Sequence, residues 1–346
     1  MNRLPARDLE EIVSNTQELW DELREQRLFI TGGTGFFGCW LVESFCRVSH
    51  LLGLNATATI LTRTPEVFAQ KCPHLASDPA VRLQRGDVRT FAFPDGEYRY
   101  VIHAATEASA KQASNEPLEM LSTIVEGTEH TLEFAATHGT RKFLLTSSGA
   151  VYGKQPPDMT HVPETYRGAP DPLDPASIYG EGKRAAELLC ALYGGKNSME
   201  CKIARCWAFC GPHLPLDQHF AIGNFIRDVL AGRPIEIKGD GSPRRSYLYA
   251  ADLAVWLWTI LFRAPALVPI NVGSDLDVSI RELAETVAKS LRAQTEIHIS
   301  KQAIPGNAPA CYVPSIQRAH ELLGLRQRIC LEECIRRTAE WYQKKH

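Results

Sequence analysis

Residues 28–38 read LFITGGTGFFG, a short apolar run followed by Gly32, Gly35 and Gly38 at the spacing GxxGxxG. The apolar run is typical of a buried strand, and Gly38–Val48 has the pattern of a helix. The first glycine permits a tight turn, the second lets a pyrophosphate approach the backbone, and the third lets the helix pack closely on the strand. The stretch therefore predicts a strand–turn–helix unit that binds a dinucleotide at the helix N-terminus.

Outward from this unit, short apolar runs alternate with helical patterns. Strands are predicted at 27–31, 57–62, 81–84, 100–103, 142–146 and 200–205, and helices at 38–48, 118–138 and 178–193. Short apolar strands separated by helices indicate a parallel sheet covered on both faces, and right-handed crossovers make it doubly wound. The predicted fold class is α/β, a Rossmann-like doubly wound parallel sheet.

The pattern changes after residue 205, where the chain becomes rich in Pro, Gly and His. Helices are predicted at 221–231, 279–292 and 332–343, a strand at 235–238, and a return to the main sheet near 270–272. We expect a dinucleotide-binding domain over 28–205 with a return near 249–275. Residues 206–248 and 276–346 would form a smaller mixed α/β substrate lobe. Residues 1–27 form an N-terminal extension, with an amphipathic helix over 7–26 packed across the domain.

The composition is that of an ordinary globular protein of 346 residues, 44% hydrophobic and 23% charged, with a net charge of −2. The chain has no excess of basic residues that would indicate nucleic-acid binding. Its longest apolar runs are too short to span a bilayer. The charged N-terminus lacks the apolar stretch of a signal peptide, so we expect a cytoplasmic protein. Cys206/Cys210 and Cys330/Cys334 are spaced for a metal on a helix but lack a histidine pair. The ten cysteines are therefore predicted to be reduced, buried thiols, with no metal site.

The end of the second predicted strand carries Arg63 where an NAD site usually has Asp or Glu. A guanidinium suits a 2′-phosphate, so Arg63 favours NADP over NAD, unless it is simply a surface arginine. Asp87 is placed to accept a hydrogen bond from the adenine amine, and Ala104 and Ala105 would let the cofactor pass close to the backbone. The predicted cofactor contacts are Gly32, Thr34, Gly35, Phe36, Phe37, Gly38, Arg63, Asp87, Val88, Ala104, Ala105, Thr106, Tyr179 and Lys183.

Tyr179 and Lys183 stand at i and i+4 of a predicted helix, on one face. A neighbouring ammonium and a positive nicotinamide ring would both lower the pKa of the phenol below its usual value near 10. Alone, such a pair is often just a surface pair. Ser148 follows a strand directly and can hydrogen-bond the reacting oxygen, although a serine-rich turn is the alternative, and Ser147 and Thr146 are possible substitutes.

Together these motifs resemble those of the extended short-chain dehydrogenase/reductase family, in its nucleotide-sugar epimerase and dehydratase branch. The resemblance runs from about residue 28 to the C-terminus and includes TGGTGFFG, GDV at 86–88, HAAT at 103–106, SSGAVYG at 147–153, YGEGK at 179–183 and GDGSPRRSYLYAAD at 239–252. It implies a nucleotide-sugar substrate, with Arg245 on the diphosphate, and a homodimer through the helices at 118–138 and 178–193. The expected substrate contacts are Thr106, Ser148, Asn224 and Arg245.

The resemblance also implies a first step that removes hydride from a sugar carbon, usually C4. Family 4,6-dehydratases place Asp-Glu after the catalytic Ser/Thr, and decarboxylases use a Glu there. This chain has Gly149-Ala150, which offers no proton chemistry. We therefore expect a 4-epimerase or a 4-keto-sugar reductase, with a dehydratase or decarboxylase as the alternative. A non-catalytic cofactor-binding regulator is a remote alternative, because such relatives typically lose the Tyr or the Lys.

Two positions depart from the family pattern. Ile124 stands where an Asn usually precedes the helical Gly-Thr, and Ala208 replaces an Asn that contacts the diphosphate. The sugar pocket is thus predicted to be unusual. Candidates to line it are His213, His219, Asn224, Thr106 and Glu107, with a purely structural role as the alternative for each histidine.

Overall fold

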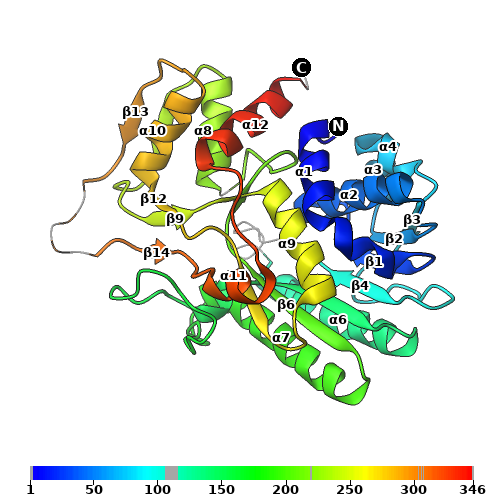
Figure 1. Cartoon of the computed structure of the whole chain (residues 1–346). Coiled ribbons are helices and arrows are strands. Elements are labelled where there is room, and N and C mark those ends of the chain that lie inside the picture. Colours follow the sequence, from blue (N-terminus) through cyan, green and yellow to red (C-terminus); the bar gives the residue numbers. More distant parts are fainter. Residues whose placement is uncertain are drawn as a thin grey trace.

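The computed structural model describes residues 3–105, 116–218, 220–302, 304, 306 and 308–344. Its centre is a seven-stranded parallel sheet in the order β11-β6-β5-β4-β1-β2-β3 (Figure 1). The strands are β1 (Arg27–Thr31), β2 (Thr57–Thr62), β3 (Val81–Arg85), β4 (Tyr100–His103), β5 (Lys142–Ser148), β6 (Glu200–Cys206) and β11 (Pro269–Val272). The strand order reverses at β1, which pairs with both β2 and β4. Such a reversal opens a crevice at the carboxyl ends of the strands. The predicted doubly wound α/β fold is confirmed.

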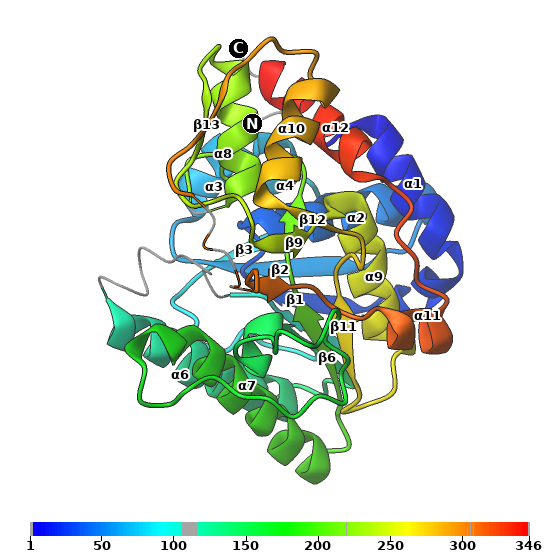
Figure 2. The ribbon, with the colours of Figure 1, turned by 90° about the vertical axis from the view of Figure 1, so that its left-hand side faces the viewer.

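Helices cover both faces of this sheet (Figure 2). One face carries α6 (Pro117–Thr137) and α7 (Ile178–Lys196), and the other carries α2 (Phe36–Leu52) and α9 (Ala250–Arg263). Successive residues of β1 enter opposite cores: Leu28 and Ile30 join the α2/α9 cluster, and Phe29 joins the α6/α7 cluster. All three are fully buried. Each such side chain contributes roughly 1.5–3 kcal/mol, which explains why the centre of β1 is a continuous apolar run.

The N-terminal segment is not the single helix predicted over 7–26. An α-helix, α1 (Ala6–Thr16), is followed by a 3₁₀ helix, η1 (Gln17–Leu23). Thr16 leaves the helical region at φ −129°, and its hydroxyl donates to the Ile12 carbonyl at 2.6 Å and accepts from Trp20 Nε1 at 2.9 Å. The break turns the buried Trp20 ring onto Trp258 of α9, with ring centroids 4.7 Å apart. As predicted, the segment packs across the domain.

Helix α9 has no counterpart among the predicted elements. Every residue from Ala250 to Phe262 is buried. A helix surrounded by protein lacks the polar stripe by which an amphipathic helix is identified. It lies between the sheet and α1 and leads from the chain after β10 back to β11, the strand predicted near 270–272.

The remaining elements form a lobe beyond the carboxyl ends of the strands, together with short connecting pieces. The lobe contains α8 (Ala221–Leu230), β8 (Ile235–Ile237), α10 (Ile280–Ser290), β13 (Ile297–Ile299) and α12 (Leu331–Gln343). A three-stranded sheet joins β12 (Asp277–Ser279), β9 (Arg244–Ser246) and β14 (Cys311–Tyr312). The connecting pieces are α3 (Pro65–Lys71), α4 (Pro73–Ala76), η2 (Gly149–Tyr152), η3 (Pro175–Ser177), β7 (Phe209–Cys210), β10 (Leu248–Tyr249) and α11 (Gln317–Leu323). Among the helices described, none has the length and apolarity needed to cross a membrane.

Candidate active site

The glycine loop connects β1 to α2 at the strand-order reversal. Gly32 has φ +70°, and a Cβ on it would lie 2.3 Å from the Ala104 carbonyl oxygen. A Cβ on Gly38 would lie 2.3 Å from the Gly32 carbonyl oxygen, so α2 could not approach the turn as closely with any other residue there. Both positions thus require glycine for backbone reasons.

Gly35 is different, because it is exposed and a Cβ on it would meet only the Gly32 oxygen, at 3.4 Å. Within the described chain no side chain caps the start of α2 at Gly35. An open backbone surface before an uncapped helix N-terminus fits a pyrophosphate, whose charge the helix dipole favours. Phe36 and Phe37 begin the helix, and the Phe37 ring packs edge-on against Phe209, 5.1 Å away.

The end of β2 brings Arg63 near Asp87, the residue predicted to meet the adenine. The hydrogen bond from Arg89 holds the pKa of Asp87 below its usual value, and the exposed Arg63 guanidinium adds a smaller effect in the same direction. Arg89 Nε lies 2.8 Å from one carboxylate oxygen of Asp87, and Nη2 lies 3.1 Å from the other. The Asp87 carboxylate is therefore paired with Arg89. Val88 is buried against Gly127 of α6.

The end of β4 carries the small residues predicted beside the cofactor. The amides of Ala104 and Ala105 both donate to the Thr31 hydroxyl at 3.2 Å, which holds this strand end against the glycine loop. His103 bonds Thr31 through Nδ1 at 2.9 Å and Thr128 through Nε2 at 3.1 Å. Its complete burial lowers its pKa to about 3, so the ring is neutral and serves as a fixed link. Thr106 and Glu107 lie outside the described residues, as does His219.

Ser148, Tyr179 and Lys183 are brought together at the end of β5 and the first turns of α7. Ser148 is buried, accepts from the Ala150 amide at 3.1 Å, and has a side-chain hydrogen bond with Tyr179. Lys183 Nζ lies 5.9 Å from the centre of the Tyr179 ring and donates to the Thr146 carbonyl at 2.8 Å. The three side chains therefore share one site at the sheet's carboxyl edge.

Two glycines explain how α7 reaches this position. A Cβ on Gly180 would lie 2.7 Å from the Ala150 carbonyl oxygen, and one on Gly182 would lie 3.0 Å from a methyl group of Ile124. The YGEGK segment therefore lies directly against η2 and α6. Ile124 packs there with an apolar side chain where the family pattern has a polar one.

The protein groups around Tyr179 do not by themselves produce the predicted lowering of its pKa, which also counted the positive nicotinamide ring. Burial raises the pKa of this phenol above 10, and the hydrogen bond with Ser148 offsets this only in part. Burial also lowers the pKa of Lys183 from 10.5 to about 8. Burial therefore disfavours the charged form of Lys183. The Lys183 ammonium thus stabilises the tyrosinate form of Tyr179 less than the i, i+4 spacing suggested.

The two substitutes considered for Ser148 have other partners. The Ser147 hydroxyl donates to Glu187 at 2.6 Å, and that carboxylate also pairs with Arg205 at 2.6 Å. The Thr146 hydroxyl donates to the His103 carbonyl at 3.2 Å. Ser148 is therefore the hydroxyl of this strand end that bonds the tyrosine.

The sequence patterns missed two aromatic residues beside Ser148. Tyr312 of β14 has a side-chain hydrogen bond with Ser148, and its hydroxyl lies 2.8 Å from where a Cβ on Gly149 would be. The Trp207 ring lies 2.7 Å from the same position, and the two rings are 4.4 Å apart. Nothing in the local sequence signals this contact, because β14 lies more than 160 residues after Ser148. Gly149 is thus required for space.

Arg245 adjoins this cluster from β9. It pairs in register with Tyr312, and its guanidinium lies 5.7 Å from the centre of that ring. Its Nη1 donates to the carbonyl of Ala310 at 3.2 Å. Asn224 lies on α8, where its side-chain oxygen accepts from Arg227 at 3.2 Å. His213 is buried near the start of α2, against Trp341.

Lys183 gives the site a testable stability signature. Its folded pKa of about 8 lies below 10.5, so the unfolded chain binds more protons between these values and stability rises with pH across that window. Replacing Lys183 with Met should therefore stabilise the fold by about 1–3 kcal/mol at pH 7, an advantage that disappears above about pH 10.5. Urea unfolding at pH 7 and pH 10.5 measures both values. A variant less stable than wild type at pH 7 would contradict this account.

Comparisons with known proteins agree with this geometry. Residues 28–273 match the model of the NAD-dependent epimerase/dehydratase family. UDP-glucuronic acid decarboxylase 6 from Arabidopsis thaliana is 30% identical over 307 residues, which are 89% of this chain and 86% of that protein. UDP-glucuronic acid decarboxylase 1 from Xenopus tropicalis is 28% identical over 93% of this chain and 73% of its own length.

Solved structures show the same fold. A UDP-glucose 4-epimerase from Thermotoga maritima has a TM-score of 0.76 at 21% identity, covering 92% of this chain and 99% of its own. A UDP-glucuronic acid 4-epimerase from Bacillus cereus, in complex with UDP-glucuronic acid and NAD, has a TM-score of 0.77 at 20% identity and covers 93% of this chain and all of its own. The chain therefore belongs to the NAD-dependent epimerase/dehydratase family and is a nicotinamide-dependent enzyme of the extended short-chain dehydrogenase/reductase type.

Proposed function

We propose that this enzyme epimerises a nucleotide sugar at C4, with Ser148, Tyr179 and Lys183 as its catalytic residues. The observation that carries the proposal is what lies beside Ser148. Gly149 and Ala150 supply no acid or base, and the space over Gly149 is filled by Trp207 and the Tyr312 hydroxyl. With no carboxylate at these positions, hydride transfer coupled to one proton transfer is the chemistry that these residues support. Dehydration and decarboxylation would each need the acid or base that family members carry there.

Each catalytic side chain has a defined task in this proposal. The nicotinamide, when bound, accepts and returns the hydride. Tyr179 takes the proton from the sugar hydroxyl through its phenolic oxygen, and Ser148 donates a hydrogen bond to the same sugar oxygen. Lys183, anchored on the Thr146 carbonyl, keeps a positive charge beside the phenol at neutral pH. Because burial opposes tyrosinate, the positive charge of the bound oxidised nicotinamide is needed to favour it.

The substrate's nucleotide would bind in the lobe. Arg245 can place a guanidinium on the diphosphate, since it adjoins the site and pairs with main-chain carbonyls rather than with a carboxylate in the described chain. Asn224 is a further candidate contact from α8. The named activities of the sequence relatives and solved structures above concern UDP sugars, so a UDP sugar is the first substrate class to test.

A 4-keto-sugar reductase is the second candidate, and Arg63 favours it. This exposed guanidinium follows β2, where a cofactor's 2′-phosphate would bind, and a reductase must exchange its oxidised cofactor for a reduced one in each cycle. We propose NADP binding on this ground. A reductase would consume one NADPH per sugar, whereas an epimerase would show no net consumption.

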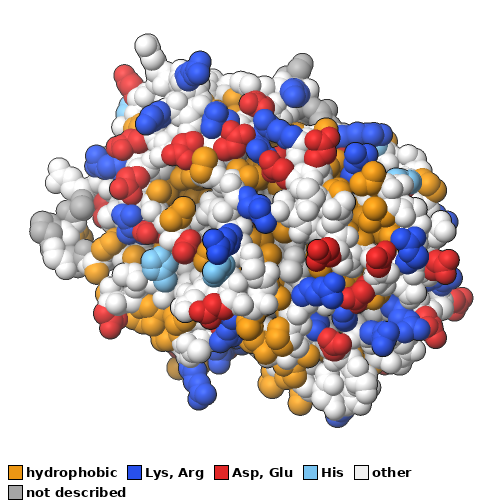
Figure 3. Space-filling model, in the orientation of Figure 1, with side chains coloured by type: hydrophobic (Ala, Val, Ile, Leu, Met, Phe, Trp, Pro, Cys, Tyr) orange, Lys and Arg blue, Asp and Glu red, His pale blue; other side chains and the backbone are white. Residues whose placement is uncertain are grey.

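We also propose a cytoplasmic homodimer that pairs through α6 and α7. Leu118 of α6 and Leu188 and Leu192 of α7 are large apolar side chains that are 78%, 61% and 53% exposed. Hydrophobic groups interrupt the charged surface near the lower edge of Figure 3, where α7 runs in Figure 1. A second copy would cover them.

The test is an incubation of the purified enzyme with UDP sugars and UDP-4-keto sugars, each with NAD⁺, NADPH or no added cofactor. Interconversion of C4 isomers without net nicotinamide consumption is the expected result. Stoichiometric NADPH oxidation on a keto sugar would establish the reductase instead. Release of CO₂ from UDP-glucuronic acid, or loss of water from a hexose, would overturn the proposal. Either reaction would show that an acid or base other than positions 149 and 150 acts in this site.

A further inference from the structure

A cluster of metal-ligating side chains lies behind the glycine loop, outside the catalytic site. Cys39 comes from the first turns of α2, Cys72 from the connection between α3 and α4, and His213 from the loop after β7. One ligand atom from each of these three lies within 4.8 Å of the other two. Across the described part of the chain, this is the one group of three His, Cys, Asp or Glu residues that meets this criterion.

The geometry is close to what a tetrahedral zinc site needs. With Zn–S bonds near 2.3 Å and Zn–N bonds near 2.0–2.1 Å, neighbouring ligand atoms lie roughly 3.5–3.8 Å apart. The ligand atoms of Cys39, Cys72 and His213 lie within 4.8 Å of one another, so each pair would have to approach by about 1 Å at most to bind zinc. Two thiolates and one imidazole are ligands that zinc prefers over calcium or magnesium, which select oxygen. Three protein ligands leave a fourth position for water.

The cluster is also enclosed and held in place. Cys39 and Cys72 are fully buried and His213 is 6% exposed. His213 adopts a left-handed backbone with φ +71°, which is uncommon for a residue with a Cβ. One of its imidazole nitrogens lies beside the two sulfur atoms. The preceding carbonyl, of Pro212, accepts from Trp40 Nε1 at 2.9 Å, and the Trp341 ring packs on the imidazole with centroids 4.8 Å apart.

We propose that Cys39, Cys72 and His213 bind a zinc ion that ties the cofactor-binding half of the enzyme to its substrate lobe. The three ligands join the helix that follows the glycine loop, the segment that follows Arg63, and the chain that leads into α8. A neighbouring contact shows that the first two segments already meet, since His74 Nε2 lies 3.3 Å from Glu43 of α2. The zinc site does not depend on which sugar reaction the enzyme catalyses.

The test uses the full-length protein purified in the presence of a phosphine reductant. Elemental analysis should find one zinc per chain, and cobalt added to the metal-free protein should give a thiolate-to-cobalt charge-transfer band with the strong visible bands of a tetrahedral site. We expect Cys72→Ser and His213→Gln each to weaken zinc binding at least tenfold, measured by competition with a chromogenic chelator. Only Cys72→Ser should also reduce the charge-transfer intensity, because it removes one of the two thiolates.

A matched control is available in the apolar cluster between the sheet and helices α6 and α7. Cys39 and Cys72 form a buried, hydrogen-bonded thiol pair, and so do Cys190 and Cys201. Cys190 and Cys201 belong to no such three-residue group among the described residues. Cys190→Ser should therefore leave zinc content and affinity unchanged, and circular dichroism checks that each variant is folded. The proposal is overturned if wild type binds no zinc, if Cys190→Ser loses as much zinc as Cys72→Ser, or if the folded His213→Gln variant binds zinc as tightly as wild type.

Discussion

Replacing Tyr179 with Phe is expected to lower kcat about a thousandfold while leaving cofactor affinity within about twofold of wild type. Loss of a positioned general acid–base group typically costs 10²–10⁴-fold in rate. The change removes one oxygen and keeps the ring, which packs near Lys183 and bonds Ser148 through that oxygen alone. Cofactor binding is measured by nicotinamide fluorescence titration, and turnover by separating the sugar products.

Tyr193 provides the control for this experiment, because it lies on the same helix near its outer end. Tyr193→Phe should retain wild-type turnover and stability. If Tyr179→Phe keeps more than about a tenth of wild-type turnover, the tyrosine is not the proton-transfer group and the proposed mechanism fails.

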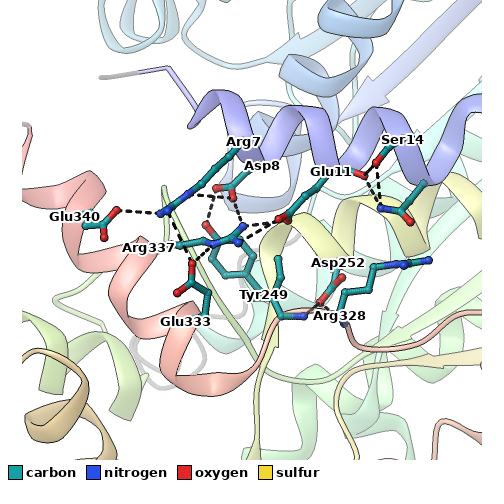
Figure 4. Close-up of polar contacts among 12 residues, drawn as sticks. Arg7, Asp8, Glu11, Ser14, Tyr249, Asp252, Arg328, Glu333, Arg337 and Glu340 are labelled. Atoms are coloured by element: carbon teal, nitrogen blue, oxygen red, sulfur yellow. Dashed lines mark hydrogen bonds and ion pairs between the residues drawn. The ribbon is translucent and has the colours of Figure 1, made fainter.

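Replacing Arg337 with Leu is expected to lower the free energy of unfolding by about 3–5 kcal/mol, because it leaves a buried carboxylate without its cation. Figure 4 shows Arg337 of α12 reaching the carboxylates of Asp8 and Glu11 on α1. Its Nη1 lies 2.6 Å from Asp8, and its other nitrogens lie 3.1 Å from Glu11 and 2.7 Å from Glu333. Asp8 is fully buried, and burial raises its pKa even with Arg337 present.

Arg336 serves as the neighbouring control, since it is half exposed and pairs with Glu333 at 2.9 Å. An exposed pair contributes about 0–1 kcal/mol, so Arg336→Leu should scarcely change the urea midpoint. The double variant Asp8→Asn with Arg337→Leu should regain part of the loss, because the uncompensated charge is gone. Equal effects of Arg336→Leu and Arg337→Leu would show that burial of the Asp8 pair does not govern stability here.

Much of the fold could be read from local patterns. Strand and helix periodicity predicted the strands β1 to β6 along the chain, both long helices and the return at β11, because most of these strands are buried and their apolar runs are visible in the sequence. The N-terminal extension and α9 were not read correctly. The amphipathic period continues past Thr16, whereas the break there depends on Trp20 reaching Trp258. Helix α9 is buried on every side and therefore lacks the sequence period of a surface helix.

The sequence by itself determined the glycine loop and the grouping of Ser148, Tyr179 and Lys183, because strand ends and one helical turn place those residues by short-range geometry. Only the tertiary structure decided what surrounds them. Tyr312 reaches Ser148 from β14, Arg337 meets Asp8 across 329 positions of sequence, and His213 approaches Cys39 and Cys72. Burial likewise opposes the lowering of the Tyr179 pKa that its spacing from Lys183 suggested. Such contacts and the desolvation they cause depend on how distant segments pack, and no local period or spacing encodes that.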